Sequence, residues 1–356
     1  MKITKPTLLI DRKKSLANIS EMAKKAIDSN VNFRPHFKTH FSAEIGNWFR
    51  DFGVESCTVS SVEMASYFIV NGWKDVTIAF PFNPLEATTI SELASKAHIN
   101  VLIESEESLT LANELLSKSV GYFIKVDIGT HRTGVDPNNQ SLIEKLVEGS
   151  TEKIKFKGFL AHAGHTYGQS EEIEINSIFN KSVEVLTSLQ SKFGGLVSYG
   201  DTPSCSVLND FSAVDEIRPG NFIFYDWMQH QIGSCQMENI AVCMACPVVA
   251  IHSDRDEAVI YGGGVHFSKD RVLEGEDPCF GKAVNLKEGV WDTQVIGSVK
   301  KLSQEHGIIT MTSEKLSQMK VGHLIGVIPV HSCLAADLQG HYLTTTGDRI
   351  EKMAKD

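Results

Sequence analysis

Two hydrophobic patterns alternate along residues 31–225. Short runs rich in β-branched and aromatic residues predict strands, and stretches with apolar positions at helical spacing predict helices between them. The predicted strands are Val31–Phe37, Val54–Ser60, Asp75–Phe80, Ile99–Glu104, Val120–Asp127, Lys155–His162, Leu196–Gly200 and Glu216–Phe224. The predicted helices include Lys13–Asp28, Ser61–Asn71, Glu106–Ser117, Gln140–Glu148 and Glu171–Lys192.

This alternation is typical of an α/β fold with a parallel sheet. Eight strands separated by helices favour a (β/α)8 barrel of the TIM type. A doubly wound open sheet is the alternative, because alternation alone does not distinguish a closed sheet from an open one. No GxGxxG motif follows the first predicted strand, which counts against the open sheet.

The pattern changes after about residue 231. Helical stretches become rare, and apolar runs are separated by Gly, Pro and Asp. We therefore predict a barrel over residues 12–231 and a β-rich second domain over 232–356, to which residues 1–11 add a strand. The apolar runs of the second domain are Ile240–Ile251, Ala258–Tyr261, Trp291–Val299 and Leu324–Val330.

Composition narrows the class of protein. A net charge of -10, from 34 basic and 44 acidic residues, argues against a nucleic-acid partner. No run reaches the roughly 18 apolar residues of a membrane span, and the N-terminal residues lack the features of a secretory signal. The seven cysteines are scattered and odd in number. We expect a cytoplasmic protein with reduced thiols and no membrane partner.

Candidate chemistry begins at the end of the first predicted strand. In a (β/α)8 barrel the carboxyl ends of the strands form the active-site face, and Lys38 lies at such an end. A lysine in a partly apolar site can have a lowered pKa and bond covalently to an aldehyde cofactor. A surface lysine after a strand is the alternative that position alone leaves open.

The segment Pro35-His36-Phe37-Lys38-Thr39-His40 resembles the cofactor-lysine motif of the D-serine dehydratase and D-threonine aldolase family. The resemblance extends from Thr7-Leu8-Leu9-Ile10-Asp11 to His331-Ser332-Cys333. It implies an alanine-racemase-like fold and pyridoxal 5'-phosphate (PLP) held by Lys38. Phe41 departs from the pattern, since many relatives carry a lysine there.

The resemblance also implies cofactor contacts at later strand ends. Arg132 matches an arginine near the phenolic oxygen of PLP, and His162 matches a residue that packs on the pyridine ring. The ring nitrogen is assigned to either Tyr167 or Arg218, and the choice stays open. A phosphate needs several N–H and hydroxyl donors, which barrels often place after the seventh and eighth strands. The expected phosphate ligands are Thr202, Gly220 and Asn221.

A metal site is expected at His331-Ser332-Cys333. In an extended segment the side chains of residues i and i+2 point the same way, so His331 and Cys333 could share one ion. Imidazole with thiolate suits Zn²⁺, and Mn²⁺ or another divalent ion is the alternative. The resemblance implies the same pair as the metal site of the dehydratase branch, whereas aldolase relatives more often pair the histidine with aspartate.

Two further motifs are discounted. Cys243-Met244-Ala245-Cys246 has the CxxC spacing of redox or zinc sites, but it lies in an apolar strand-like run without a second CxxC. We expect buried free thiols there. The run Gly262-Gly263-Gly264 is expected to be a turn and not a phosphate-binding loop.

The expected function is that of a PLP- and zinc-dependent D-serine dehydratase. It would convert a small D-amino acid, D-serine, to pyruvate and ammonia, and D-threonine to 2-oxobutanoate. Lys38 would remove the α-proton, and zinc would stabilise the departing hydroxide. Retro-aldol cleavage of D-3-hydroxy amino acids is the nearest alternative; racemisation and non-catalytic PLP binding are less well supported. A homodimer is expected.

Overall fold

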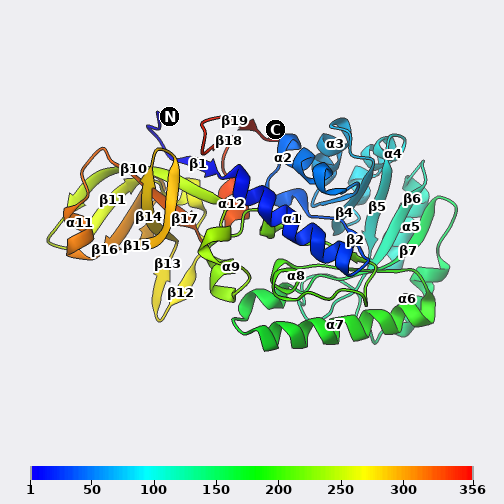
Figure 1. Ribbon diagram of the computed structural model, residues 1–356. Coiled ribbons are helices and arrows are strands. Elements are labelled where there is room, and N and C mark those ends of the chain that lie inside the picture. Colours follow the sequence, from blue (N-terminus) through cyan, green and yellow to red (C-terminus); the bar gives the residue numbers. More distant parts are fainter. Residues whose placement is uncertain (1, 355–356) are drawn as a thin grey trace. The chain divides into compact units, whose positions relative to one another are not determined.

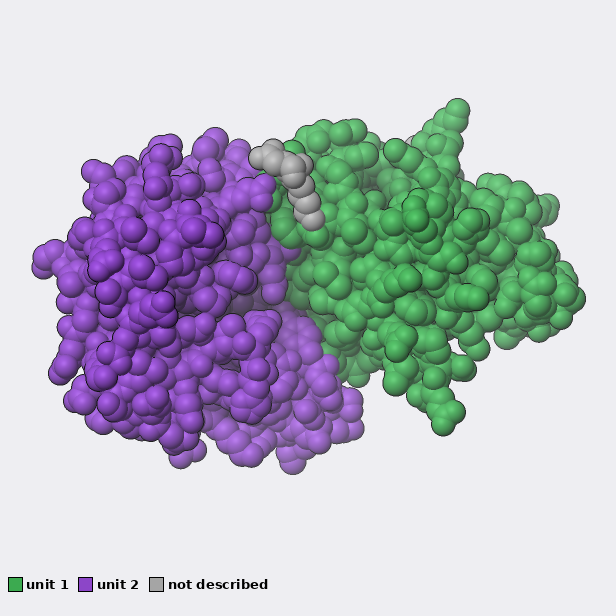
Figure 2. Space-filling view, turned by 180° about the vertical axis from the view of Figure 1, so that it is seen from behind, with its two compact units in different colours: residues 1–19, 39–44, 221–356 green, residues 20–38, 45–220 purple. Residues whose placement is uncertain are grey.

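The computed structural model describes residues 2–354, which form two compact units (Figure 2). Unit 2 contains residues 20–38 and 45–220. Unit 1 contains residues 2–19, 39–44 and 221–354, so the chain passes between the units four times. This partition differs from the predicted division at 231/232, because residues 221–231, 12–19 and 39–44 group with the β-rich unit.

Unit 2 is built on eight parallel strands in the order β2-β9-β8-β7-β6-β5-β4-β3 (Figure 1). The two end strands meet through a parallel bridge between His36 and Thr58, which closes the sheet into the predicted barrel. The strands are β2 (Asn32–Phe33), β3 (Cys57–Val59), β4 (Asp75–Pro81), β5 (His98–Ile103), β6 (Val120–Lys125), β7 (Ile154–Leu160), β8 (Leu196–Tyr199) and β9 (Glu216–Ile217).

Two barrel strands are shorter than predicted. Proline lacks an N–H for the strand ladder and restricts the residue before it. Pro35 therefore ends β2 early, and Lys38 lies in the 3-10 turn Phe37–Thr39. Pro219 likewise ends β9 at Ile217, and Asn221–Ile223 is a second 3-10 turn. The predictions of strand through Phe37 and through Phe224 are wrong for this reason.

Helices follow most barrel strands, and polar side chains cap several of their first turns. Ser61, Ser105, Asn139 and Asp201 each accept a hydrogen bond from a backbone N–H at the start of a helix. The helices are α1 (Arg12–Asp28), α2 (Ala43–Trp48), α3 (Val62–Val70), α4 (Ala87–Ala94), α5 (Glu106–Leu115), α6 (Gln140–Glu148), α7 (Glu172–Phe193) and α8 (Thr202–Val207). The predicted helices match these elements to within a few residues.

Unit 1 contains a nine-stranded sheet in the order β11-β16-β15-β14-β17-β10-β1-β18-β19. An additional pairing of β11 with β10 closes six of these strands into an antiparallel barrel. The strands are β1 (Thr7–Ile10), β10 (Val242–His252), β11 (Glu257–Tyr261), β14 (Gly281–Lys287), β15 (Val290–Leu302), β16 (His306–Met311), β17 (Leu324–Pro329), β18 (His341–Thr344) and β19 (Arg349–Glu351).

This second barrel confirms the prediction that the chain after residue 231 is rich in β-strands. β1 pairs antiparallel with β10, as expected for a strand added by residues 1–11. The helices of unit 1 are short: α9 (Trp227–Ile232), α10 (Gly264–Phe267), α11 (Ser313–Ser317) and α12 (Ser332–Asp337). Within residues 2–354, no helix is both long enough and apolar enough to cross a membrane.

Candidate active site

Four predicted cofactor residues gather at the carboxyl ends of the unit 2 strands. Lys38 follows β2, Arg132 follows β6, His162 follows β7 and Arg218 follows β9. Burial, together with the positive charges of Lys38, Arg132 and Arg218, lowers the pKa of His162 to about 3. The four side chains therefore lie close enough to interact electrostatically.

His162 is held as a neutral imidazole. Its Nδ1 lies 2.7 Å from the carbonyl oxygen of Gly200. A carbonyl only accepts, so Nδ1 carries the proton and Nε2 does not. With the pKa near 3, the ring is uncharged at neutral pH. A neutral, flat imidazole is suited to packing against an aromatic cofactor ring.

The loops after β7, β8 and β9 bring Tyr167, Thr202 and Gly220 together. The backbone N–H of Thr202 donates to Tyr167 Oη at 3.4 Å, and the N–H of Gly220 donates to Thr202 Oγ1 at 3.4 Å. The ring centroids of His162 and Tyr167 are 6.3 Å apart. Two of the three predicted phosphate ligands thus adjoin Tyr167.

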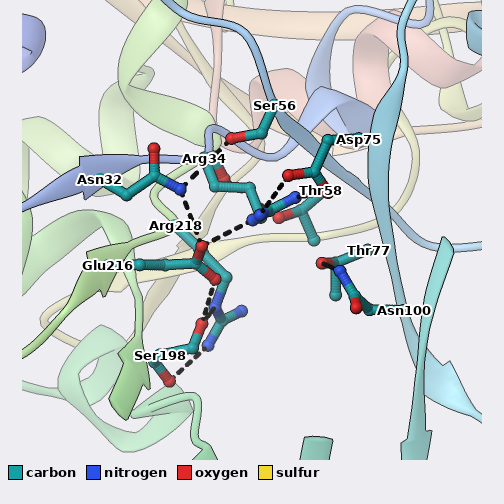
Figure 3. Close-up of polar contacts among 10 residues, drawn as sticks. All are labelled: Asn32, Arg34, Ser56, Thr58, Asp75, Thr77, Asn100, Ser198, Glu216 and Arg218. Atoms are coloured by element: carbon teal, nitrogen blue, oxygen red, sulfur yellow. Dashed lines mark hydrogen bonds and ion pairs between the residues drawn. The ribbon is translucent and has the colours of Figure 1, made fainter. Parts of the chain in front are cut away.

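Arg218 is anchored to the inner wall of the barrel (Figure 3). Its Nε donates to Ser198 Oγ at 2.6 Å, and Nη2 donates to the carbonyl oxygens of Ala161 at 2.5 Å and Ser198 at 3.2 Å. Burial lowers its pKa to about 10, so it remains a cation at neutral pH. These bonds fix one edge of the guanidinium.

A polar network continues from Arg218 across the barrel interior. Ser198 Oγ donates to Glu216 Oε1 at 2.6 Å, and Arg34 Nε donates to Glu216 Oε2 at 2.6 Å. Arg34 also makes a two-pronged ion pair with Asp75, at 2.7 and 2.9 Å. Burial opposes the charge of Arg34, but Glu216 and Asp75 outweigh it and raise its pKa. Figure 3 shows these side chains converging; they come from β4, β8, β9 and the residue that follows β2.

Two residues near the cluster were missed by the sequence analysis. Lys125, at the end of β6, is buried, and burial together with the charges of Arg218 and Arg132 lowers its pKa to about 8. Thr130 Oγ1 donates to His162 O at 2.9 Å and accepts from Gly164 N at 3.0 Å. Thr130 joins loops that follow different strands, and the burial of Lys125 beside two arginines depends on the fold. Neither feature has a local sequence signature.

The predicted metal pair lies in unit 1, at the start of a helix. His331 is the N-cap residue of α12, and Cys333 lies in its first turn. The prediction of an extended segment is therefore wrong. The side chains of His331 and Cys333 are nonetheless hydrogen-bonded to each other, because the N-cap residue still has an extended backbone, with φ -132° and ψ 100°.

An acidic side chain orients His331. Its Nδ1 lies 2.8 Å from Asp270 Oδ2. Burial alone would lower the pKa of His331, but the hydrogen bonds to Asp270 and Cys333 raise it to about 11. A zinc-binding histidine usually donates the N–H of its other ring nitrogen to a carboxylate or carbonyl, as His331 can to Asp270.

Asn221, the third predicted phosphate ligand, lies beside this pair in unit 1. Its Nδ2 donates to Asp226 Oδ2 at 2.6 Å, to Ser332 Oγ at 3.1 Å and to Cys333 Sγ at 3.6 Å. Thr39 Oγ1 and Cys333 Sγ also share a hydrogen bond, at 3.2 Å. Cys333 is thus surrounded by hydrogen-bonding groups.

Comparisons with known proteins cover nearly the whole chain. Residues 10–226 match the family model "Alanine racemase, N-terminal domain", and residues 241–345 match "Putative serine dehydratase domain". D-serine dehydratase of Dictyostelium discoideum is 30% identical over 93% of this chain and 90% of its own length. The chain belongs to the D-serine dehydratase and D-threonine aldolase-like family.

A second relative shares less of its sequence with this chain. D-threo-3-hydroxyaspartate dehydratase of Delftia sp. is 23% identical over 92% of this chain and 90% of its own length. Its solved structure superposes with a TM-score of 0.90, covering 99% of this chain and 98% of that chain. At 21% identity this likeness shows the alanine-racemase-like fold. The named relatives are dehydratases and aldolases, and the present family member is accordingly a lyase.

The family is PLP-dependent, and the residues of unit 2 fit that cofactor. Lys38, Arg132 and Arg218 all lower the pKa of His162, and the two arginines lower that of Lys125. Arg218 is buried, Lys38 is half-buried and Arg132 is exposed. A bound anion stabilises such a group of neighbouring cations, and the phosphate and phenolate of PLP supply negative charge.

Unit 1 fits a metal ion with two protein ligands. His331 and Cys333 offer an imidazole and a sulfur, which Zn²⁺ accepts. Residues 2–354 contain no group of three or more His, Cys, Asp or Glu side chains arranged to hold a metal. The remaining coordination positions would belong to water or substrate.

The two discounted motifs are structural. Cys243 and Cys246 are buried free thiols on β10, as predicted. Gly262 and Gly263 connect β11 to α10, and Gly264 is the first residue of α10. A Cβ on Gly263 would lie 2.3 Å from the carbonyl oxygen of Gln304, so a close backbone approach accounts for that glycine.

Proposed function

We propose that this protein is a PLP- and zinc-dependent D-serine dehydratase that forms pyruvate and ammonia. The observation that carries the proposal is the match along 93% of the chain to a D-serine dehydratase at 30% identity. The pairing of His331 with Cys333 supports the metal. D-Threonine is proposed as a second substrate, with 2-oxobutanoate as product.

Each group of residues then has a task. PLP, when bound, increases the acidity of the substrate α-carbon, and Lys38 would hold it and accept the α-proton. Arg132, His162, Tyr167, Thr202, Arg218, Gly220 and Asn221 are proposed to bind and orient it. A divalent ion on His331 and Cys333, when bound, stabilises negative charge on the leaving oxygen.

Solved relatives support the metal proposal. Two structures of D-threo-3-hydroxyaspartate dehydratase contain substitutions of a histidine and of a cysteine two positions later, and the second is described as metal-free. His331 and Cys333 have the same spacing in this chain. The ion bound here is proposed to be Zn²⁺.

A coupled product assay over D- and L-hydroxy amino acids tests the function. We expect pyruvate from D-serine, loss of its formation with a chelator and recovery with Zn²⁺. Cys333→Ala should behave like chelation while leaving the visible absorbance of bound PLP intact. Glycine and an aldehyde from D-threonine would instead show an aldolase, and full dehydratase activity in metal-free Cys333→Ala would rule out the role of zinc.

A further inference from the structure

Lys352 caps the helix that carries Cys333. Its side chain is buried, and Nζ donates to the carbonyl oxygens of Ala336 at 2.8 Å and Asp337 at 3.0 Å. The last carbonyls of a helix have no partner within the helix, and a cation there also complements the helix dipole. Since α12 has only six residues, its anchoring at this end fixes the orientation of its first turn.

The same ammonium group lies over the ring of Phe41. Nζ is 4.9 Å from the Phe41 centroid and 5.9 Å from that of Tyr342, within the range of cation–π interactions. Phe41 has a φ of +49°, a left-handed conformation that bulky residues seldom adopt. Surrounding contacts must therefore hold it, and one of them is the N–H of Met353, which donates to Phe41 O at 2.7 Å.

Every residue of the segment 39–42 has a partner in residues 333–353. Thr39 Oγ1 is hydrogen-bonded to Cys333 Sγ, and Tyr342 Oη donates a hydrogen bond to His40 O at 2.8 Å. Ser42 Oγ donates to Glu351 O at 2.6 Å. This segment directly follows Lys38 in the chain, and all of these contacts lie within unit 1.

We propose that Lys352 is a positioning residue, which fixes α12 and the segment 39–42 against each other. No sequence pattern marks this lysine, because its partners come from distant parts of the chain. It acts through Cys333 on one side and through Phe41 on the other. The effect on zinc rests on the proposed function, whereas the effect on the segment 39–42 does not.

The test uses Lys352→Met in the PLP- and zinc-loaded protein. Three quantities are measured: the Zn²⁺ dissociation constant by chelator competition, the rate at which a thiol reagent modifies Cys333, and amide hydrogen exchange in residues 39–42. Cys333 is the one cysteine in residues 2–354 that is not buried. We expect Zn²⁺ affinity to fall about tenfold, which is the smaller of the losses usual when a residue that orients a metal ligand is removed. Modification of Cys333 and amide exchange in residues 39–42 should both become faster.

Lys25→Met is the matched control. Lys25 Nζ donates to the carbonyl oxygens of Cys205 at 3.3 Å and Leu208 at 2.9 Å, and to that of Ser206. It therefore caps α8 in unit 2 as Lys352 caps α12. It should lower thermal stability without changing Cys333 reactivity or exchange in residues 39–42. Lys352→Arg should restore all three quantities, because a guanidinium can donate to the same carbonyls and stack on the same ring.

Several results would overturn the proposal. The first is that Lys352→Met has the same Zn²⁺ affinity, Cys333 reactivity and amide exchange as the wild-type protein, while its thermal stability is lowered as in the control. If Lys352→Met does not fold, Phe41→Leu replaces it: this variant keeps both carbonyl bonds but removes the ring, and unchanged exchange in residues 39–42 would refute the proposal. A wild-type protein that binds no Zn²⁺ and forms no pyruvate would instead refute the proposed function, leaving the exchange test valid.

Discussion

His40, which is buried, and His162, which is partly buried, are histidines that remain neutral. Burial lowers the pKa of each to about 3. An unfolded chain takes up these protons near the ordinary histidine pKa of about 6.5. Below that pH the unfolded state binds more protons than the folded state, so the stability contributed by each neutral histidine is lost as the pH falls from about 6.5 towards 3.

His40→Asn should reduce this loss. Asparagine offers an acceptor for the Ser42 N–H, which donates to His40 Nδ1 at 3.1 Å, but it does not titrate. Each titrating histidine costs about 1.4 kcal/mol per pH unit below its unfolded pKa, so between pH 6.5 and 5 the variant should lose about 2 kcal/mol less than wild type. Urea unfolding at several pH values measures this; the exposed His98→Asn serves as control, and equal slopes for wild type and His40→Asn would contradict the prediction.

Lys38 should be the residue that borohydride links to PLP. Lys125 is the lysine that could compete with Lys38 for the cofactor, because it is buried at a strand end and its pKa is lowered to about 8. Peptide mapping after reduction should find the cofactor on Lys38 alone, and Lys38→Ala should lack the absorbance of the bound cofactor. Label on Lys125 in the wild-type protein would transfer the proposed role to that residue.

At the scale of elements, strand positions were easier to predict than strand lengths. The alternation of apolar and polar stretches located all eight barrel strands, because each strand buries a short apolar run against the helices. Pro35 and Pro219 shortened the first and last strands. α8 has six residues, too few for a helical period to be recognised.

Residues of the candidate site could be predicted only where they belong to a recognisable sequence motif. The resemblance pointed to Lys38, His162 and Arg218, which the fold brings together. His331 and Cys333 are adjacent as expected, but through a helix start and not a strand. Lys352 and Thr130 depend on long-range contacts, which periodicity does not encode.

The ion network links four barrel strand segments, and Glu216 on β9 is its centre. Glu216→Gln keeps the shape but removes the charge that faces Arg34 and, through Ser198, Arg218. Removing one partner of a buried pair costs about 3–5 kcal/mol, and we expect a loss of that size in urea unfolding. Glu351→Gln, which breaks an exposed pair with Arg349, is the control. Similar stability of both variants would show that the network contributes little.

At the scale of the whole molecule, unit 1 is assembled from separate parts of the chain. β1 lies between β10 and β18, and its residues Leu8, Leu9 and Ile10 are almost fully buried. A fragment of residues 221–356 would therefore expose the β10 edge and lose an apolar strand.

Such a fragment should not fold alone. Supplying residues 1–19 as a synthetic peptide should restore part of the structure, because β1 can then pair with β10. Amide NMR dispersion of the fragment with and without the peptide measures this. The same peptide with Leu9→Ala is the control, since truncating a buried leucine costs about 2–5 kcal/mol. A well-dispersed spectrum of the fragment alone would contradict the expectation.

The position of β1 also has a consequence during synthesis on the ribosome. β1 is made before the strands of the unit 2 barrel, whereas its partner β18 is made after them. At 5–20 residues per second, the nascent strand waits on the order of tens of seconds while the entire barrel of unit 2 emerges. The pairing of β1 with β10 can form only after the barrel of unit 2 has been made, and the pairing with β18 follows later.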